Sequence, residues 1–204
     1  MATITASMFM ALDGVVDPGV GNWHFPYFND EMGVAVSSTL ATADTVLLGR
    51  TTYDSFAGAW PERETAGGDD AGMAKALGDA RKIVVSRSPQ EFTWRNSEQL
   101  EGDLVPAVAA LKRESAGSHI AMSGSVSIVR QLLAAALLDE LHLLVHPIAV
   151  RTGMRLFDEG DRPIPLTLLS SETFATGVLN LVYEPAAQIG TATYDDAKVH
   201  LPKG

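Results

Sequence analysis

The chain has 204 residues, of which 46% are hydrophobic and 20% charged, and its formal net charge is −10. This length can bury one substantial core, and the composition is that of a folded domain rather than a disordered chain. The negative charge disfavours nucleic acid and anionic membranes, and no apolar run approaches membrane length. Because the chain has no cysteine and no basic N-terminal region typical of a signal peptide, we expect a cytoplasmic protein.

Strand and helix patterns alternate along the first half of the chain. Short apolar runs predict strands, apolar residues spaced by three or four predict helices, and Asp, Gly and Pro mark the loops. In chain order the sequence predicts a strand over 3–12, a loop over 13–22, a helix over 26–42, a strand over 45–49, a short helix from Thr51 that stops near Gly58 and Pro61, a helix around 73–77 and a strand over 81–86.

The second half continues this alternation and then changes to strands alone. The predicted elements are a helix over 102–114 with Asp103 as its cap, a strand over 119–122, a helix over 126–138, a strand over 141–150, and two strands within 166–185 joined near Thr176 and Gly177. We therefore expect one α/β domain over 1–185, with a largely parallel sheet, helices on both faces and an antiparallel hairpin at one edge. Residues 186–204 are polar and are predicted to form a tail.

The turn Gly49-Arg50-Thr51-Thr52 joins a predicted buried strand to a helix and contains the first basic residue of the chain. Free backbone N–H groups and the positive end of the helix dipole meet at such a turn. Glycine allows close approach to the backbone, and a guanidinium can bind an oxyanion by two parallel hydrogen bonds. The turn therefore suits a phosphate, although a helix cap with a surface arginine has the same pattern.

Two other strands end in similar turns. Ser123-Gly124-Ser125 leads from a strand into a helix, and Ser86-Arg87-Ser88-Pro89 follows a third strand with one arginine and two hydroxyls. Serine capping and a Ser-Pro turn explain them as well. Since ligands of parallel sheets bind beyond the carboxyl ends of strands, the three turns together predict a site for a ligand with several phosphates.

Six short motifs occur in a fixed order over about residues 3–184. They are SMFMALDGVV, LLGRTTYDSF, KIVVSRS, SGSVSIVRQLL, DELHLLVHPIAV and RLF. In this order they resemble the dihydrofolate-reductase-like family, and within it the reductase domain of the bifunctional riboflavin-pathway deaminase-reductase. The resemblance implies a three-layer fold that binds NADPH across the strand ends and transfers hydride to a pterin- or pyrimidine-like ring.

The resemblance also implies roles for individual residues. The cofactor phosphates would contact Gly49, Arg50, Thr51 and Thr52, and the adenosine side would contact Ser86 and Arg87. The pyrophosphate would contact Ser123, Gly124, Ser125, Val126 and Ser127. The nicotinamide would lie beside Asp13 and Gly14. The chain departs from the family at two turns. A usual glycine pair is Ser123-Gly124, and a usual glycine-rich turn is Arg151-Thr152-Gly153, near the substrate pocket.

Dihydrofolate reductases anchor the substrate ring with an acidic residue on the first helix. Asp30 would face water, whereas Glu31 lies beside Tyr27 on the flank of the apolar stripe, so Glu31 is the predicted anchor. A solvated acid in the first helical turn has the same pattern. Tyr27 and Trp23 are the predicted substrate contacts, although a loop aromatic such as Trp23 also packs on a core.

The histidines do not predict a metal site. His142 and His146 would lie about 13 Å apart on one strand, too far for a shared ion. We expect a core or interface role for both. His24 is closer to the predicted pocket, but a single loop histidine is usually solvated.

We expect an NADPH-dependent reductase of a small heterocyclic substrate. The alternatives are the riboflavin-pathway step, reduction of a phosphoribosylamino-pyrimidine, a nucleotide-binding protein without catalysis, and a structural domain. No zinc-deaminase motif is found in the chain. The apolar strands at 141–150 and 179–185 predict a homodimer, because they offer more apolar strand than one domain edge should expose.

Overall fold

The computed structural model describes residues 1–17, 19, 22–157, 162–187 and 191–202. In this part of the chain, eight strands form one sheet in the order β5-β4-β3-β6-β1-β7-β10-β9. Their bounds are β1 (Thr3–Ala11), β3 (Thr45–Gly49), β4 (Arg81–Val85), β5 (Ser97–Gln99), β6 (His119–Ser123), β7 (Glu140–His146), β9 (Leu166–Thr173) and β10 (Leu179–Pro185). The strands from β5 to β7 are parallel, and β10 and β9 are antiparallel. The predicted mixed sheet with its antiparallel hairpin is confirmed.

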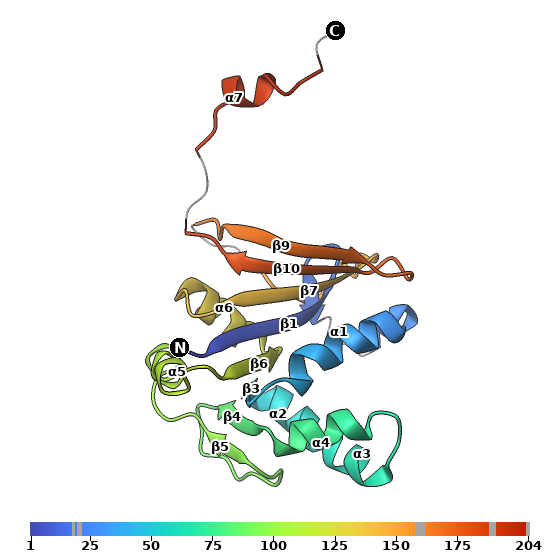
Figure 1. Ribbon diagram of the computed structural model, residues 1–204, viewed down its shortest axis with the longest axis vertical. Helices are drawn as coiled ribbons and strands as arrows, with labels where there is room; N and C mark the ends of the chain where they lie inside the picture. The colour runs from blue at the N-terminus through green and yellow to red at the C-terminus, as the bar shows by residue number, and fades with distance from the viewer. Residues whose placement is uncertain (18, 20–21, 158–161, 188–190, 203–204) are drawn as a thin grey trace.

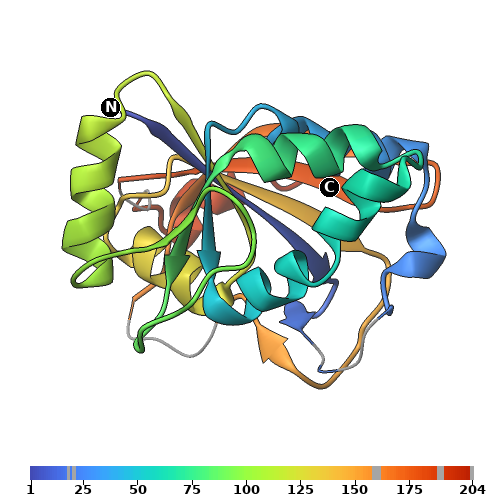
Figure 2. The same cartoon turned by 90° about the horizontal axis from the view of Figure 1, so that it is seen from below.

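Helices cover both faces of this sheet (Figures 1 and 2). Their bounds are α1 (Asp30–Ala41), α2 (Arg50–Ala57), α3 (Trp60–Ala66), α4 (Ala71–Asp79), α5 (Leu104–Glu114), α6 (Val126–Ala134) and α7 (Tyr194–Lys198), and η1 (Phe25–Tyr27) is a 3-10 turn. The main core lies between the sheet and helices α5 and α6. A second core joins the sheet to α1, α2 and α4 on the other face, so the three-layer α/β fold is confirmed.

The alternation of side chains along β1 separates these two layers. Ile4, Ala6 and Met8 belong to the core beneath α5 and α6. Successive residues of a strand point to opposite faces, so Thr5 and Phe9 lie on the α1 side. Phe9 packs there against the small cluster that contains Met32 of α1.

Lys82 is a fully buried cation in β4. Its Nζ donates hydrogen bonds to the carbonyl oxygens of Leu77, Gly78 and Ala80 at 2.8–2.9 Å, and it lies 4.4 Å from the centre of the Trp94 ring. Burial, with repulsion from Arg95, lowers the pKa of Lys82 to about 8, so the ammonium stays protonated at pH 7. Lys82 therefore joins the end of α4 to the strand that leads into Ser86 and Ser88.

One helix begins later than predicted, and one helix, α3, was not predicted. The helix expected over 26–42 begins at Asp30, because Asn29 caps it: the Asn29 side chain accepts a hydrogen bond from the Met32 N–H at 3.0 Å. Pro61, expected to end a helix, lies in the first turn of α3. Proline is tolerated there because its missing N–H would have no partner within the helix.

Several other boundaries also differ. The predicted loop 13–22 contains β2 (Val15–Asp17), which pairs with β8 (Met154–Arg155) in a second, two-stranded sheet. The last helix of the main core ends at Ala134 rather than 138, and β7 ends at His146 rather than 150. Asp103 occupies the cap position of α5, but its side chain forms no capping hydrogen bond.

The segment 186–204, predicted to be a patternless tail, contains α7. Thr193 and Asp196 form a reciprocal capping box at its start, so this helix was missed although a T-x-x-D pattern precedes it. In Figure 1, α7 lies away from the sheet. The domain boundary at residue 185 remains a prediction.

Candidate active site

The turns after β3 and β6 meet through Ser125. Its Oγ accepts a hydrogen bond from the Gly49 N–H at 2.9 Å and lies 3.0 Å from Oγ1 of Thr52. A Cβ on Gly49 would lie 2.1 Å from this Oγ, so only glycine leaves room for Ser125. The glycine was predicted to admit a ligand to the backbone, whereas in the structure its open side is filled by Ser125.

The accessible glycine is instead Gly124. It has a φ of +80°, and a Cβ placed on it would meet only the Thr52 hydroxyl, at 3.8 Å. This left-handed conformation explains why a glycine stands there. The helices that follow the two turns, α2 and α6, have no side-chain cap, so their first N–H groups are open to an anionic ligand.

The turn after β4 lies at the same edge of the sheet as the turns after β3 and β6, because β4, β3 and β6 are consecutive neighbours in the sheet. Nη1 of Arg50 lies 3.5 Å from Oγ of Ser88, and Nε lies 3.5 Å from the carboxylate of Asp54. The Arg50 side chain is 55% exposed. Arg87 is also exposed, and its guanidinium has no partner among the described residues. Two arginines are therefore available beside the three strand ends.

The Asp13-Gly14 turn follows β1 and is held by the segment after β7. The Asp13 Oδ2 accepts a hydrogen bond from the Arg151 N–H at 2.7 Å. Burial alone would raise the pKa of this carboxyl, but backbone N–H groups, Arg151 first, outweigh it and lower the pKa below its usual range. Gly14 has a φ of +82° and forms the turn.

Arg151 carries backbone strain in the turn where the resemblance implies glycines. Its φ is +72°, a conformation that costs a residue with a side chain about 1–2 kcal/mol relative to glycine. We expect Arg151→Gly to raise the free energy of unfolding by about 1 kcal/mol in urea titrations. Arg113→Gly, an exposed change in the last turn of α5, should lower it. A lower free energy of unfolding in Arg151→Gly would contradict the claim that the backbone is strained at Arg151.

An aromatic cluster encloses His146 at the end of β7. The centres of the Trp23 and Tyr27 rings lie 5.0 and 5.7 Å from that of His146, and Phe9 and His24 complete the cluster. His146 is fully buried; its Nδ1 lies 2.8 Å from the Leu144 carbonyl oxygen, whereas Nε2 has no partner among the described residues. The core role expected for His146 is confirmed, but His24 is packed in the cluster rather than solvated.

This packing makes the stability depend on pH. Burial lowers the pKa of His146, and burial with repulsion from His146 lowers that of His24, both from an ordinary value of 6.5. The unfolded chain then binds more protons, so the free energy of unfolding is highest above about pH 6.5 and falls as the pH decreases below it. We expect His146→Asn to flatten this dependence in urea titrations from pH 5 to 8. His200→Gln, in the exposed tail, should leave it unchanged; an unaltered slope in His146→Asn would contradict the prediction.

Glu31 is bonded to the hairpin of the sheet. Its Oε2 accepts hydrogen bonds from the Ala175 N–H at 2.8 Å and from Nδ2 of Asn29 at 2.7 Å. These contacts connect α1 to the turn between β9 and β10 and account for the position of the carboxylate without a ligand. The role of Glu31 as a substrate anchor remains a prediction.

A cavity of about 810 Å³ begins at Ser127 and follows the outer side of α6 towards Leu156 and Ile164. It touches the predicted cofactor residues only at Ser127. Among the described residues, no group of three or more His, Asp or Glu could hold a metal ion, and no helix is long and apolar enough to cross a membrane.

Two features of this site were not predicted from the sequence. Ser88 was part of a predicted turn but was not selected, and its only signal was its place two residues after Ser86. The hydrogen bond between Asp13 and Arg151 joins residues 138 positions apart.

The fold and the three adjoining strand ends define a dihydrofolate-reductase-like α/β domain. The chain matches the model of the RibD C-terminal domain over residues 2–180, and it belongs to that family. This is a reductase-like family, which supports an oxidoreductase activity of the pyrimidine-reductase type.

Two Bacillus subtilis proteins are similar in sequence. Uncharacterized protein YyaP is 26% identical over 180 residues, which cover 88% of this chain and 93% of that protein. Uncharacterized protein YwjB is 25% identical over 174 residues, which cover 83% and 90%.

Solved structures share the fold at lower identity. A putative riboflavin biosynthesis protein from Shewanella sp. PV-4 has a TM-score of 0.68 at 19% identity, covering 91% of this chain and 99% of the other. A pyrimidine reductase-like protein from Corynebacterium diphtheriae has a TM-score of 0.62 at 14% identity, covering 92% and 93%. Acinetobacter baumannii RibD has a TM-score of 0.64 at 14% identity, covering 91% of this chain but 58% of that protein.

Proposed function

We propose that the protein is an NADPH-dependent reductase that transfers hydride to a small heterocyclic, pterin- or pyrimidine-like substrate. The observation that carries this proposal is the Ser125 hydroxyl, which joins the turns after β3 and β6 into one cradle. Family membership supports the reaction class. NADPH would supply the hydride, and the chain would supply orientation and charge compensation.

The residues of the cradle suit the phosphates of NADPH. The open N–H groups at the start of α6 and the left-handed Gly124 allow a pyrophosphate to approach the backbone. Thr51 and Thr52 at the start of α2 add hydroxyls. Arg50, beside Ser88, and the exposed Arg87 would bind the additional phosphate on the adenosine side, which a dinucleotide without that phosphate would not require.

The substrate end of the site would lie between the Asp13-Gly14 turn and α1. Trp23 and Tyr27 there belong to the aromatic cluster that shields His146 from water. A flat heterocycle could pack on such rings. Glu31, at the start of α1, would accept a hydrogen bond from the substrate ring.

Titration of the protein with NADPH tests the proposal. We expect saturable binding by calorimetry and fluorescence, and oxidation of bound NADPH when pterin or pyrimidine substrates are added. Saturable binding without oxidation of NADPH by any substrate would favour a nucleotide-binding protein without catalysis. Absence of binding at millimolar NADPH would contradict both functions and favour a structural role.

Reduction of a phosphoribosylamino-pyrimidine in riboflavin biosynthesis is the second candidate. It is favoured by the structural similarity to a protein described as pyrimidine reductase-like. Turnover of that substrate, measured beside a pterin, distinguishes it from reduction of another heterocycle.

We also propose a homodimer through the late strands. The strands on which the dimer prediction rested, β7 and β10, are paired on both sides within the sheet, whereas β9 lies at the edge, and its Leu168 and Leu169 are about half exposed. An open edge with exposed leucines is a surface suited to pairing with a second copy. A monomeric mass in light scattering at micromolar concentration would contradict the dimer.

A further inference from the structure

The α1 side of the sheet is polar where the strands begin. Thr3 and Thr5 of β1 lie on the same face as Phe9, and their neighbours across the sheet are His119 of β6 and Glu140 of β7. A sheet face beneath a helix is usually apolar, as it is farther along β1 around Phe9. The polar start of the strands therefore needs a separate explanation.

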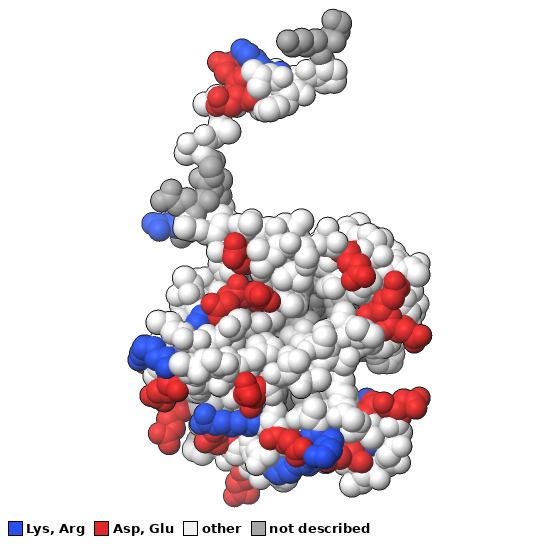
Figure 3. Space-filling model, in the orientation of Figure 1, with Lys and Arg blue, Asp and Glu red and all other residues white. Residues whose placement is uncertain are grey.

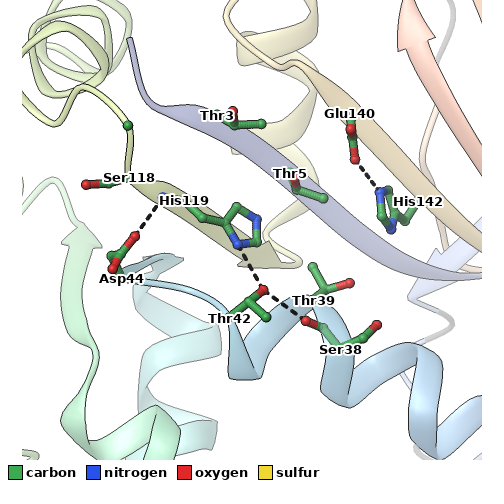
Figure 4. Close-up of a pocket in the computed structure, with 11 residues that line it drawn as sticks. Thr3, Thr5, Ser38, Thr39, Thr42, Asp44, Ser118, His119, Glu140 and His142 are labelled. Carbon is green, nitrogen blue, oxygen red and sulfur yellow. Dashed lines mark hydrogen bonds and ion pairs between the residues drawn. The ribbon is translucent and has the colours of Figure 1, made fainter.

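These side chains line a pocket of about 530 Å³ beneath the C-terminal half of α1 (Figure 4). Thr39 and Thr42 close it from the helix side, and Oγ1 of Thr42 lies 3.3 Å from Nδ1 of His119. Thr5 forms part of the floor and is only 3% exposed. The pocket is open to solvent and is lined mainly by hydroxyl and imidazole groups.

The pocket has a carboxylate on each side. Oδ2 of Asp44, just before β3, accepts a hydrogen bond from the His119 N–H at 2.8 Å, and Oε2 of Glu140 lies 2.8 Å from Nε2 of His142. The second oxygen of each carboxylate has no hydrogen bond within the described chain. The described residues that line the pocket include no lysine or arginine. In Figure 3 the basic side chains lie mainly over the lower elements of this face.

The sheet order sets the spacing of the two carboxylates. Asp44 leads into β3 and Glu140 begins β7, and β3, β6, β1 and β7 are consecutive neighbours. Three steps of about 4.8 Å across the sheet, with an offset of two residues or about 6.6 Å along the strands, place the two acids about 16 Å apart. The side chains of Thr3, Thr5 and His119 lie between them, with Thr42 on the helix side (Figure 4).

We propose that this pocket binds a linear aliphatic polyamine, with one terminal ammonium at Asp44, the other at Glu140, and the inner amine hydrogen-bonded to the hydroxyls. Two negative ends and a lining without cations disfavour phosphates and other anions. The ligand-binding cradle proposed for NADPH lies at the opposite, carboxyl ends of the same strands. The pocket is therefore a second site, and its occupancy does not depend on the proposed reductase function.

Calorimetric titration of the full chain with putrescine, spermidine and spermine at low ionic strength tests this proposal. We expect saturable binding of one molecule per chain, with affinity that rises from the short diamine to the longer amines that reach both carboxylates. Glu140→Gln and Asp44→Asn should each weaken spermidine binding by about two- to fivefold, the range for exposed charge pairs. Both substitutions keep an oxygen that can accept the existing hydrogen bonds.

Glu101→Gln is the matched control, since it removes the same charge from an exposed position outside the pocket. It should bind spermidine as the wild type does, and circular dichroism should show that all three variants are folded. Absence of saturable binding in the wild type would overturn the proposal. An equal loss of affinity in Glu101→Gln would overturn it as well, because it would show attraction to the net charge alone.

Discussion

Replacing Arg50 by Ala is expected to weaken NADPH binding by about 1.5–3 kcal/mol, the range for hydrogen bonds to charged groups. The Arg50 side chain is 55% exposed and lies at the start of α2, with weak contacts to Asp54 and Ser88. It can therefore turn to a phosphate without breaking a strong interaction. Folding should barely change, since loss of an exposed side chain usually alters stability by about 0.5 kcal/mol or less.

A comparison of three variants tests whether the Arg50 guanidinium itself contributes to NADPH affinity. Arg50→Lys should recover only part of the affinity, because an ammonium provides charge without the planar pair of donors. Arg63→Ala removes an arginine of similar exposure, 52%, from the neighbouring helix α3 and should bind NADPH normally. Affinity and melting temperature would be measured in one buffer. Wild-type affinity in Arg50→Ala would show that this arginine does not bind the cofactor.

Replacing Lys82 by Met should lower the free energy of unfolding by about 2–4 kcal/mol, because it removes the ammonium donor from three buried carbonyl groups, of which only that of Gly78 keeps another donor among the described residues, the Asn96 amide. Methionine has a similar length and fills the space beside Trp94, so the loss would come from hydrogen bonds and the cation–π contact rather than from a cavity. Urea unfolding at pH 7 measures this change.

Lys75→Met is the matched control for this substitution. Lys75 lies on α4 and is 66% exposed, and among the described residues its ammonium pairs only with the carboxylate of Asp79, a surface contact of small energy. Its loss should alter stability by about 0.5 kcal/mol or less. Equal stabilities of Lys82→Met and Lys75→Met would show that the buried ammonium contributes no net stability.

The parts of the fold that depend on local patterns could be predicted from the sequence. The buried run at 45–49 and the turn at Ser123-Gly124-Ser125 were found because neighbouring residues determine strand and turn propensities. Parallel strands then bring their carboxyl ends together, so the meeting of the turns after β3, β4 and β6 could also be predicted.

Contacts between distant residues could not be predicted in this way. Ser125, 76 residues later in the chain, fills the space beside Gly49. The glycine therefore leaves room for this serine, whereas the prediction was that it admits a ligand to the backbone. Asn29 was a better helix start than Pro26 because its side chain could reach the Met32 N–H, a choice that periodicity alone does not make. The left-handed Arg151 could not be found either, since no residue pattern other than glycine or asparagine marks that conformation.

The central position of β1 determines the order in which the sheet can form during synthesis. The strand occupies residues 3–11, but its two neighbours are β6 and β7, which begin at residues 119 and 140. Its apolar residues must therefore remain unpaired until more than half of the chain has left the ribosome, whereas β3 and β4 can pair earlier. Such long loop closures slow folding and expose strands to aggregation, so the nascent chain is expected to depend on chaperones until β7 emerges.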